Sequence, residues 1–262
     1  MIFDTHAHYD DEVYEEDREQ LLESMYQKEV KCIVNAGSSM KACHKMLELT
    51  KQYSTIYGAI GIHPSETGNL TEEDYLWLKN QTTNPKIVAV GEIGLDYYWP
   101  EPDKEIQKQW FTRQLQMATE VQLPVIIHSR DAAKDTLDIL KDWNNQKTGG
   151  VIHCFSYSVE MAEEYLKMGY YIGIGGVLTF KNAKKLVEVA EIVPLDHILL
   201  ETDCPYLSPE PFRGKRNQSD RIELVAEKLA QIKNISKEEV LEKTWLNAVE
   251  FYHISTERLV TE

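Results

Sequence analysis

Short apolar runs alternate with amphipathic stretches along the whole chain. The apolar runs have the length of buried strands, and the stretches between them repeat their apolar residues at helical spacing. Strands are predicted at residues 1–8, 31–36, 56–62, 87–93, 123–128, 150–153, 170–174 and 198–201. Helices are predicted at residues 13–29, 39–53, 71–81, 104–121, 131–143, 158–168, 182–193, 221–232 and 236–252.

This alternation gives about eight strand–helix units in a chain of 262 residues. Their number and order predict an α/β fold of the (β/α)8 TIM-barrel type, with residues 1–262 forming one domain. A doubly wound open sheet is the alternative, but its usual glycine-rich phosphate-binding turn is missing after the first strand. The barrel is therefore the favoured prediction.

Composition narrows the classes of protein to consider. The hydrophobic content of 42% suffices for a sizeable core, and the formal net charge of −15 opposes binding to nucleic acid or anionic membrane without a local positive feature. No apolar run approaches the ~20 residues of a membrane span, and no signal peptide is evident. The four cysteines lack metal or redox spacing. We expect a cytoplasmic protein with reduced thiols, no membrane partner and no obligate protein partner.

Side chains that can bind metal fall at the ends of several predicted strands. His6 and His8 lie on one face at the end of the first strand, because strand residues alternate between two faces. The carboxyl ends of barrel strands meet at one rim, where catalytic residues gather. The candidate ligands at this rim are His6, His8, Glu92, His128, His153 and Asp203.

This set is too large for one tetrahedral ion and predicts a two-metal site with Glu92 as a bridging ligand. Taken singly, each residue has an ordinary alternative: His128 or His153 as a hydrogen-bonded core histidine, Asp203 as a cap for the next turn. Their joint placement at strand ends favours the metal site. His63 also ends a strand, in GIHP, and is interpreted as a substrate contact.

The motifs around these residues resemble those of the TatD family of metal-dependent deoxyribonucleases, within the amidohydrolase superfamily. They are DTHAH at 4–8, GIHP at 61–64, GEIGLDYY at 91–98, LPVIIHSRDA at 123–132, HCFS at 153–156 and ETDCPYLSPEPFRGKRN at 201–217. The resemblance implies a distorted barrel, a divalent-metal site formed by the six candidates, and substrate contacts near His63 and Arg130. One departure is Gln218 and Ser219, where family members often have Glu-Pro.

The chemistry implied is hydrolysis of DNA phosphodiester bonds. Two divalent ions, of Mg, Mn, Zn or Ni, would activate water and grip the phosphate. Asp203 is the candidate base, and Glu92 the bridging carboxylate. A basic rim of Arg130, Arg213, Lys215, Arg216 and Arg221 would add positive charge. Tyr97, Tyr98, Trp99 and Phe155 are candidates either for stacking on bases or for core packing.

The expected activity is that of a 3′–5′ exonuclease that prefers single-stranded DNA. The resemblance implies the direction, and a small basic rim on an acidic chain gives little grip on a long duplex. Two alternatives remain: a hydrolase of a small ester or amide within the same superfamily, and a metal-dependent binding protein without turnover.

Overall fold

The strands form one parallel sheet that curls into a barrel. A computed structural model describes residues 1–143 and 148–255, and within these ranges eight strands pair in chain order. The strands are β1 Ile2–Ala7, β2 Val30–Ala36, β3 Ile56–Ile60, β4 Ile87–Asp96, β5 Val125–Arg130, β6 Gly150–Ile152, β7 Tyr171–Ile174 and β8 Ile198–Leu200. The barrel is uneven, because β4 has 10 residues whereas β6 and β8 have 3 each and β7 has 4. The predicted (β/α)8 architecture is confirmed.

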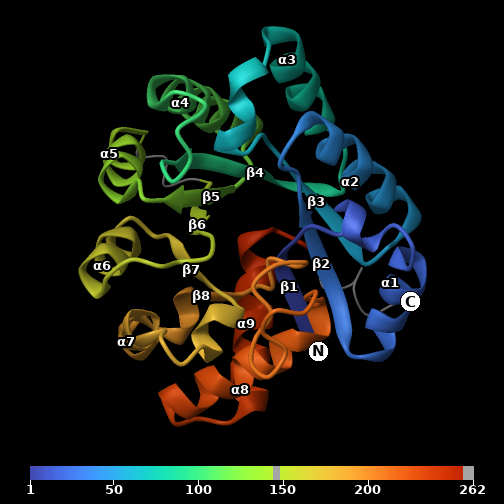
Figure 1. The fold of residues 1–262 in the computed structure, drawn as a ribbon, viewed down its shortest axis with the longest axis vertical. Helices are drawn as coiled ribbons and strands as arrows, with labels where there is room; N and C mark the ends of the chain where they lie inside the picture. The colour runs from blue at the N-terminus through green and yellow to red at the C-terminus, as the bar shows by residue number, and fades with distance from the viewer. Residues whose placement is uncertain (144–147, 256–262) are drawn as a thin grey trace.

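Helices surround the strands, as Figure 1 shows. They are α1 Arg18–Gln27, α2 Met40–Gln52, α3 Glu72–Gln81, α4 Lys104–Val121, α5 Ala133–Trp143, α6 Val159–Lys167, α7 Lys184–Ile192, α8 Ile222–Lys233 and α9 Lys237–Phe251. The predicted helix at 13–29 is wrong at its start, because a 3₁₀ turn at Glu12–Tyr14 comes first and α1 begins at Arg18. None of the helices in the described ranges is long and apolar enough to cross a bilayer.

The barrel interior is filled by apolar side chains from strands all around the sheet. This cluster takes alternate residues from single strands, such as Cys32 and Val34 of β2, as inward-facing positions must. Trp245 and Phe251 of α9 belong to the same cluster, and Trp245 packs edge-on against Phe3 at the start of β1. Helix α9 therefore closes the end of the barrel at which the strands begin, leaving the opposite mouth for a site.

Strand β4 is longer than its sequence predicts. We expected it to end at residue 93, with Glu92 at its tip, but it continues to Asp96 and pairs with β5 through Gly94–His128 and Asp96–Arg130. Gly94, the first residue beyond the predicted strand, is needed for close packing: a Cβ there, at φ +146°, would lie 1.9 Å from the His128 carbonyl oxygen. Glu92 and His128 therefore project from inside the ladder, not from its end.

The barrel closes through a seam between β1 and β8. Here regular pairing gives way to one isolated bridge, Ala7 with Cys204, in the described part of the chain. Asp4 adds side-chain bonds across the seam: it accepts from the Thr202 hydroxyl at 2.6 Å and from the Ser219 hydroxyl at 2.6 Å. Ser219 thus helps to close the barrel.

Candidate metal centre

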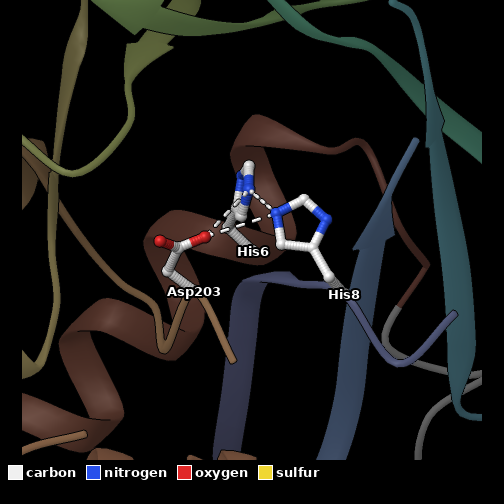
Figure 2. A group of neighbouring side chains, drawn as sticks. All are labelled: His6, His8 and Asp203. Atoms are coloured by element: carbon white, nitrogen blue, oxygen red, sulfur yellow. Dashed lines mark hydrogen bonds and ion pairs between the residues drawn. The ribbon is translucent and has the colours of Figure 1, made fainter. Parts of the chain in front are cut away.

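The six candidate ligands converge at the mouth of the barrel. Figure 2 shows His6 and His8, from β1 and the residue just beyond it, pointing toward Asp203 from the loop after β8. The Nε2 atoms of His6 and His8 lie 3.0 Å apart, and Asp203 Oδ1 lies 3.8 Å and 3.3 Å from them. The two sides of the seam therefore supply one group of ligand atoms.

Glu92 lies between two sets of histidines and turns one carboxylate oxygen toward each. Its Oε2 lies 3.3 Å from His6 Nε2 and 3.7 Å from His8 Nε2. Its Oε1 lies 2.7 Å from His128 Nδ1 and 3.9 Å from His153 Nε2. The Glu92 side chain is 5% exposed, so its charge depends on these neighbours for stabilisation.

This donor set fits divalent cations. Imidazole nitrogens and carboxylate oxygens are brought together in a buried space, where they need protons or metal ions to offset the buried negative charge. Among the described residues four groups of ligand atoms form, each within 4.8 Å: His6 with His8 and Asp203, His6 with Glu92 and His153, His63 with Glu92 and His128, and His153 with Cys154 and Glu201. Buried His6 Nδ1 has no hydrogen-bond partner among the described residues.

Outer contacts orient two of the histidines. His8 Nδ1 lies 3.1 Å from the Ala36 carbonyl oxygen, which must accept its proton, so Nε2 is the nitrogen that faces the group. His153 Nδ1 lies 3.0 Å from Glu201 Oε2, and the second oxygen of Glu201 accepts from Cys154 N at 2.6 Å. Because Glu201 is buried and both its oxygens are used, it holds His153 with Nε2 toward Glu92 and Asp203.

Two acidic residues at this centre escaped the sequence reasoning. Glu201 looked like the end of a strand, and Asp96 like part of a loop. Asp96 Oδ2 lies 3.1 Å from His128 Nε2, while its Oδ1 accepts from Tyr98 N at 3.0 Å. The signal available was their sequence position: Asp96 lies four residues after Glu92, on the same face of β4, and Glu201 two residues before Asp203.

The backbone at Asp203 turns sharply to present its carboxylate. Its φ of +54° lies in the left-handed region, which aspartate tolerates better than most residues. Asp203 N donates to the His6 carbonyl at 2.9 Å, and Asp203 O accepts from Tyr206 N at 2.8 Å. The turn is thereby fixed against β1, beside the histidines.

The charges of the centre support one another. Burial alone would lower the pKa of His8 and of His153, but Asp203, Glu92 and, for His153, Glu201 outweigh it and raise these values to about 9 and about 10. Burial opposes ionisation of Glu92 and Asp203 as well, yet the surrounding histidines lower the pKa of both carboxyls. The protein thus holds two carboxylates and at least two imidazolium groups before any metal binds.

His63 lies beside the centre, its ring 4.3 Å from that of His128. Burial and the neighbouring His128 charge lower its pKa to about 3, so the ring is neutral at ordinary pH. Its Nδ1 accepts from Ser65 N at 3.2 Å, which places its proton on Nε2. The structure brings His63 close enough to Glu92 and His128 to count among the possible ligands as well as substrate contacts.

Some of the residues expected to face substrate are exposed in the structure, and others are buried or paired. Arg130 and Tyr98 are exposed, with the guanidinium 3.8 Å above the tyrosine ring. Phe155 is 2% exposed and packs edge-on against Tyr165, so its candidacy for base stacking is wrong and core packing is right. Arg216 forms an ion pair with Asp17, which leaves it little free charge for a basic rim.

The chain is similar to known proteins over nearly its whole length. A family model described as TatD related DNase matches residues 3–253. YabD of Bacillus subtilis (strain 168), named an uncharacterized metal-dependent hydrolase, is 44% identical over 255 residues, covering 97% of this chain and 100% of that protein. YcfH of Escherichia coli (strain K12), named in the same way, is 36% identical, with 99% and 98% covered.

Solved structures agree. The TatD homologue YJJV from Escherichia coli K12 superposes with a TM-score of 0.91 at 31% identity, covering 97% of this chain and 98% of that one. The chain is therefore a metal-dependent hydrolase built on a (β/α)8 barrel. More narrowly, it belongs to the TatD-related DNase family, whose model spans nearly its whole length.

Replacing Glu201 with glutamine should weaken metal binding by roughly 10- to 100-fold, the usual effect of losing an outer partner of a histidine ligand. Glutamine has one acceptor oxygen for two donors, so it cannot serve both His153 Nδ1 and Cys154 N. Isothermal titration of the metal-stripped protein with Mn²⁺ measures the change. Glu238→Gln, on the exposed face of α9, is the matched control. Equal affinity in Glu201→Gln and wild type would refute the orienting role.

Metal binding should release protons and strengthen as pH rises toward about 9. With pKa values raised to about 9 and about 10, His8 and His153 carry protons at pH 7, and an ion must displace them. Apparent affinity then rises about tenfold per pH unit for each proton released. Titration in two buffers of different ionisation enthalpy counts the protons. His8→Ala should release fewer, and the exposed His44→Ala should match wild type. Affinity independent of pH would contradict this prediction.

Proposed function

We propose that this chain hydrolyses phosphodiester bonds in DNA with two divalent ions at the barrel mouth, acting from the 3′ end of single strands. The observation that carries the proposal is Glu92, whose two oxygens face different histidines. A carboxylate in this position suits sharing between two ions, and two-metal sites are a common device for phosphodiester hydrolysis. The family description, TatD related DNase, supports the choice of DNA.

In this proposal His6, His8, Glu92 and Asp203 would hold one ion, and Glu92, His128 and His153 would hold the other. When bound, the ions lower the pKa of water and offset the charge of the phosphate oxygens. The nitrogen-rich donor set favours Mn, Ni or Zn by affinity, and Mg enters through its abundance.

The chain's own residues supply the proton transfer and the grip on substrate. Asp203 is the more exposed of the two carboxylates, at 17% against 5% for Glu92, and its lowered pKa keeps it ionised. It accepts the proton of the attacking water as the water oxygen bonds to phosphorus and the P–O bond to the leaving group breaks. Neutral His63 donates from Nε2 to a phosphate oxygen, and Arg130 adds a charged contact.

The preference for ends follows from charge. The net charge is −15, and two of the expected rim arginines serve the fold: Arg216 pairs with Asp17, and Arg221 donates to the Arg216 carbonyl. Few phosphate contacts remain, so a long duplex gains little affinity. A single-stranded end enters the mouth without the unpairing cost of a few kcal/mol that a duplex carries. Binding should accordingly show a shallow salt dependence.

Glu92→Ala should reduce kcat by more than about a hundredfold and lower metal content. Loss of an outer partner of a metal ligand already reduces metal affinity or activity by about 10- to 100-fold, and loss of a ligand should reduce it further. Arg130→Ala should instead raise KM by roughly tenfold with kcat near wild type, as a charged hydrogen bond is worth about 1.5–3 kcal/mol. Steady-state kinetics and elemental analysis separate the two effects. Arg113→Ala is the control, because Arg113 pairs with Glu72 away from the mouth. Wild-type metal content and kcat in Glu92→Ala would argue against bridging.

A linear single strand labelled at its 5′ end should shorten stepwise from the 3′ end, while a closed circle of the same sequence is spared. Cleavage should stop after chelation and return with added Mn²⁺ or Mg²⁺. Denaturing gels read the products. Equal cutting of the circle would show an endonuclease. Cutting of neither DNA, with turnover of a small ester or amide, would identify the small-substrate hydrolase, and metal binding without any turnover the non-catalytic binding protein.

A further inference from the structure

Two aromatic side chains stand exposed directly after β4. Tyr98 is 53% exposed and Trp99 55%, and their rings meet at right angles with centroids 4.8 Å apart. Exposed apolar groups that adjoin one another, unlike single scattered ones, can mark a binding site. Tyr97, the residue before them, is held differently, since its hydroxyl donates to Asp135 at 2.8 Å.

The Arg130 guanidinium carbon lies over the Tyr98 ring, 3.8 Å from its centroid. In the described ranges no carboxylate lies within ion-pair distance of Arg130, whereas Arg113 pairs with Glu72 and Arg216 with Asp17. In a chain of net charge −15, an arginine stacked on an aromatic ring keeps its charge and hydrogen-bonding edge available to a ligand.

The surface formed by Tyr98, Trp99 and Arg130 lies next to the metal centre. Arg130 follows His128 by two residues on β5, so both side chains lie on the same face, roughly 6.6 Å apart along the strand. Asp96, the register partner of Arg130, contacts His128 through one oxygen and the Tyr98 backbone through the other. A phosphate at the metal centre would therefore place a base of the same or the next nucleotide over these rings.

The surface is also held in place. Tyr97 N donates to the Arg130 carbonyl at 2.9 Å, which extends the β4–β5 pairing beyond Asp96. Buried Gln107 donates from its amide nitrogen to the carbonyls of Asp96 and Pro102, at 3.0 Å and 2.9 Å, and so ties both ends of the loop to α4. A ligand would find the rings already positioned, which lowers the entropy lost on binding.

We propose that Tyr98, Trp99 and Arg130 form a stacking platform for a nucleobase next to the scissile phosphate. The proposal rests on the proposed function for its substrate and adds what the enzyme recognises: the face of an unstacked base. In a duplex each base is covered by its neighbours, so the platform favours single strands and ends. Every base has such a face, so the platform is tolerant of sequence.

Kinetics on DNA give the first test. In Tyr98→Ala/Trp99→Ala, KM for a single-stranded oligonucleotide should rise about tenfold or more, since one stacked base is worth about 1–3 kcal/mol. Tyr98→Phe/Trp99→Phe should restore it. When the oligonucleotide ends in an abasic nucleotide, KM for wild type should rise by the same factor. KM for the double alanine variant should not rise further. Tyr26→Ala is the matched control, because Tyr26 is exposed and lies under Lys31 at the far end of the barrel.

Binding of ligands that contain no phosphodiester bond gives a test that does not depend on nuclease activity. Metal-loaded wild type should bind thymidine 5′-monophosphate about tenfold more tightly than 2-deoxyribose 5-phosphate, which lacks the base. The double alanine variant should bind both equally, with unchanged metal content.

The two tests separate the two proposals. If wild type does not cut DNA but its preference for the nucleotide disappears in the double alanine variant, the nuclease proposal fails and the platform stands. If wild type cuts DNA while the variant keeps its KM and its preference for the nucleotide, the platform is overturned and the nuclease proposal stands. Equal binding of both ligands by wild type also overturns the platform.

Discussion

The centre depends on one buried carboxylate. Glu92 lies inside the β4 ladder with its side chain almost fully enclosed, a position in which an isolated charge would be neutralised by a large rise in pKa. The shift goes the other way because the histidines are arranged around it. Their positions in turn follow from the register of neighbouring strands, so the architecture of the barrel and the charge state of the site are a single physical problem.

Much of this arrangement could be predicted from the sequence. Alternating apolar and amphipathic stretches predict the order of strands and helices, because periods of about 2 and 3.6 residues distinguish the two. The rule that barrel strands present their carboxyl ends at one rim then brings His6, His8 and Asp203 together, although they lie at opposite ends of the chain. The structure places these residues in one group of ligand atoms.

The rest required the structure, for physical reasons. The predicted strand stops at residue 93, just before Gly94, and only the pairing with β5 shows that it continues through Gly94 to Asp96. Glu201 contacts His153, 48 residues earlier in the chain, and local pattern carries no information about such a contact. Phe155 packs against Tyr165 of α6, and the burial of its ring depends on how that helix folds back onto the barrel. Asp96 was overlooked because its role depends on the extension of β4 to that residue.

The seam between β1 and β8 gives the metal a second significance. Thr5 and Leu200, hydrogen-bonded across it, are 195 residues apart in the sequence. An ion held by His6, His8 and Asp203 would span this junction and join the first strand to the last. Such an ion binds the closed barrel and not the open chain, so its binding free energy adds to the free energy of unfolding. Removing the ion would therefore lower the melting temperature of the whole barrel.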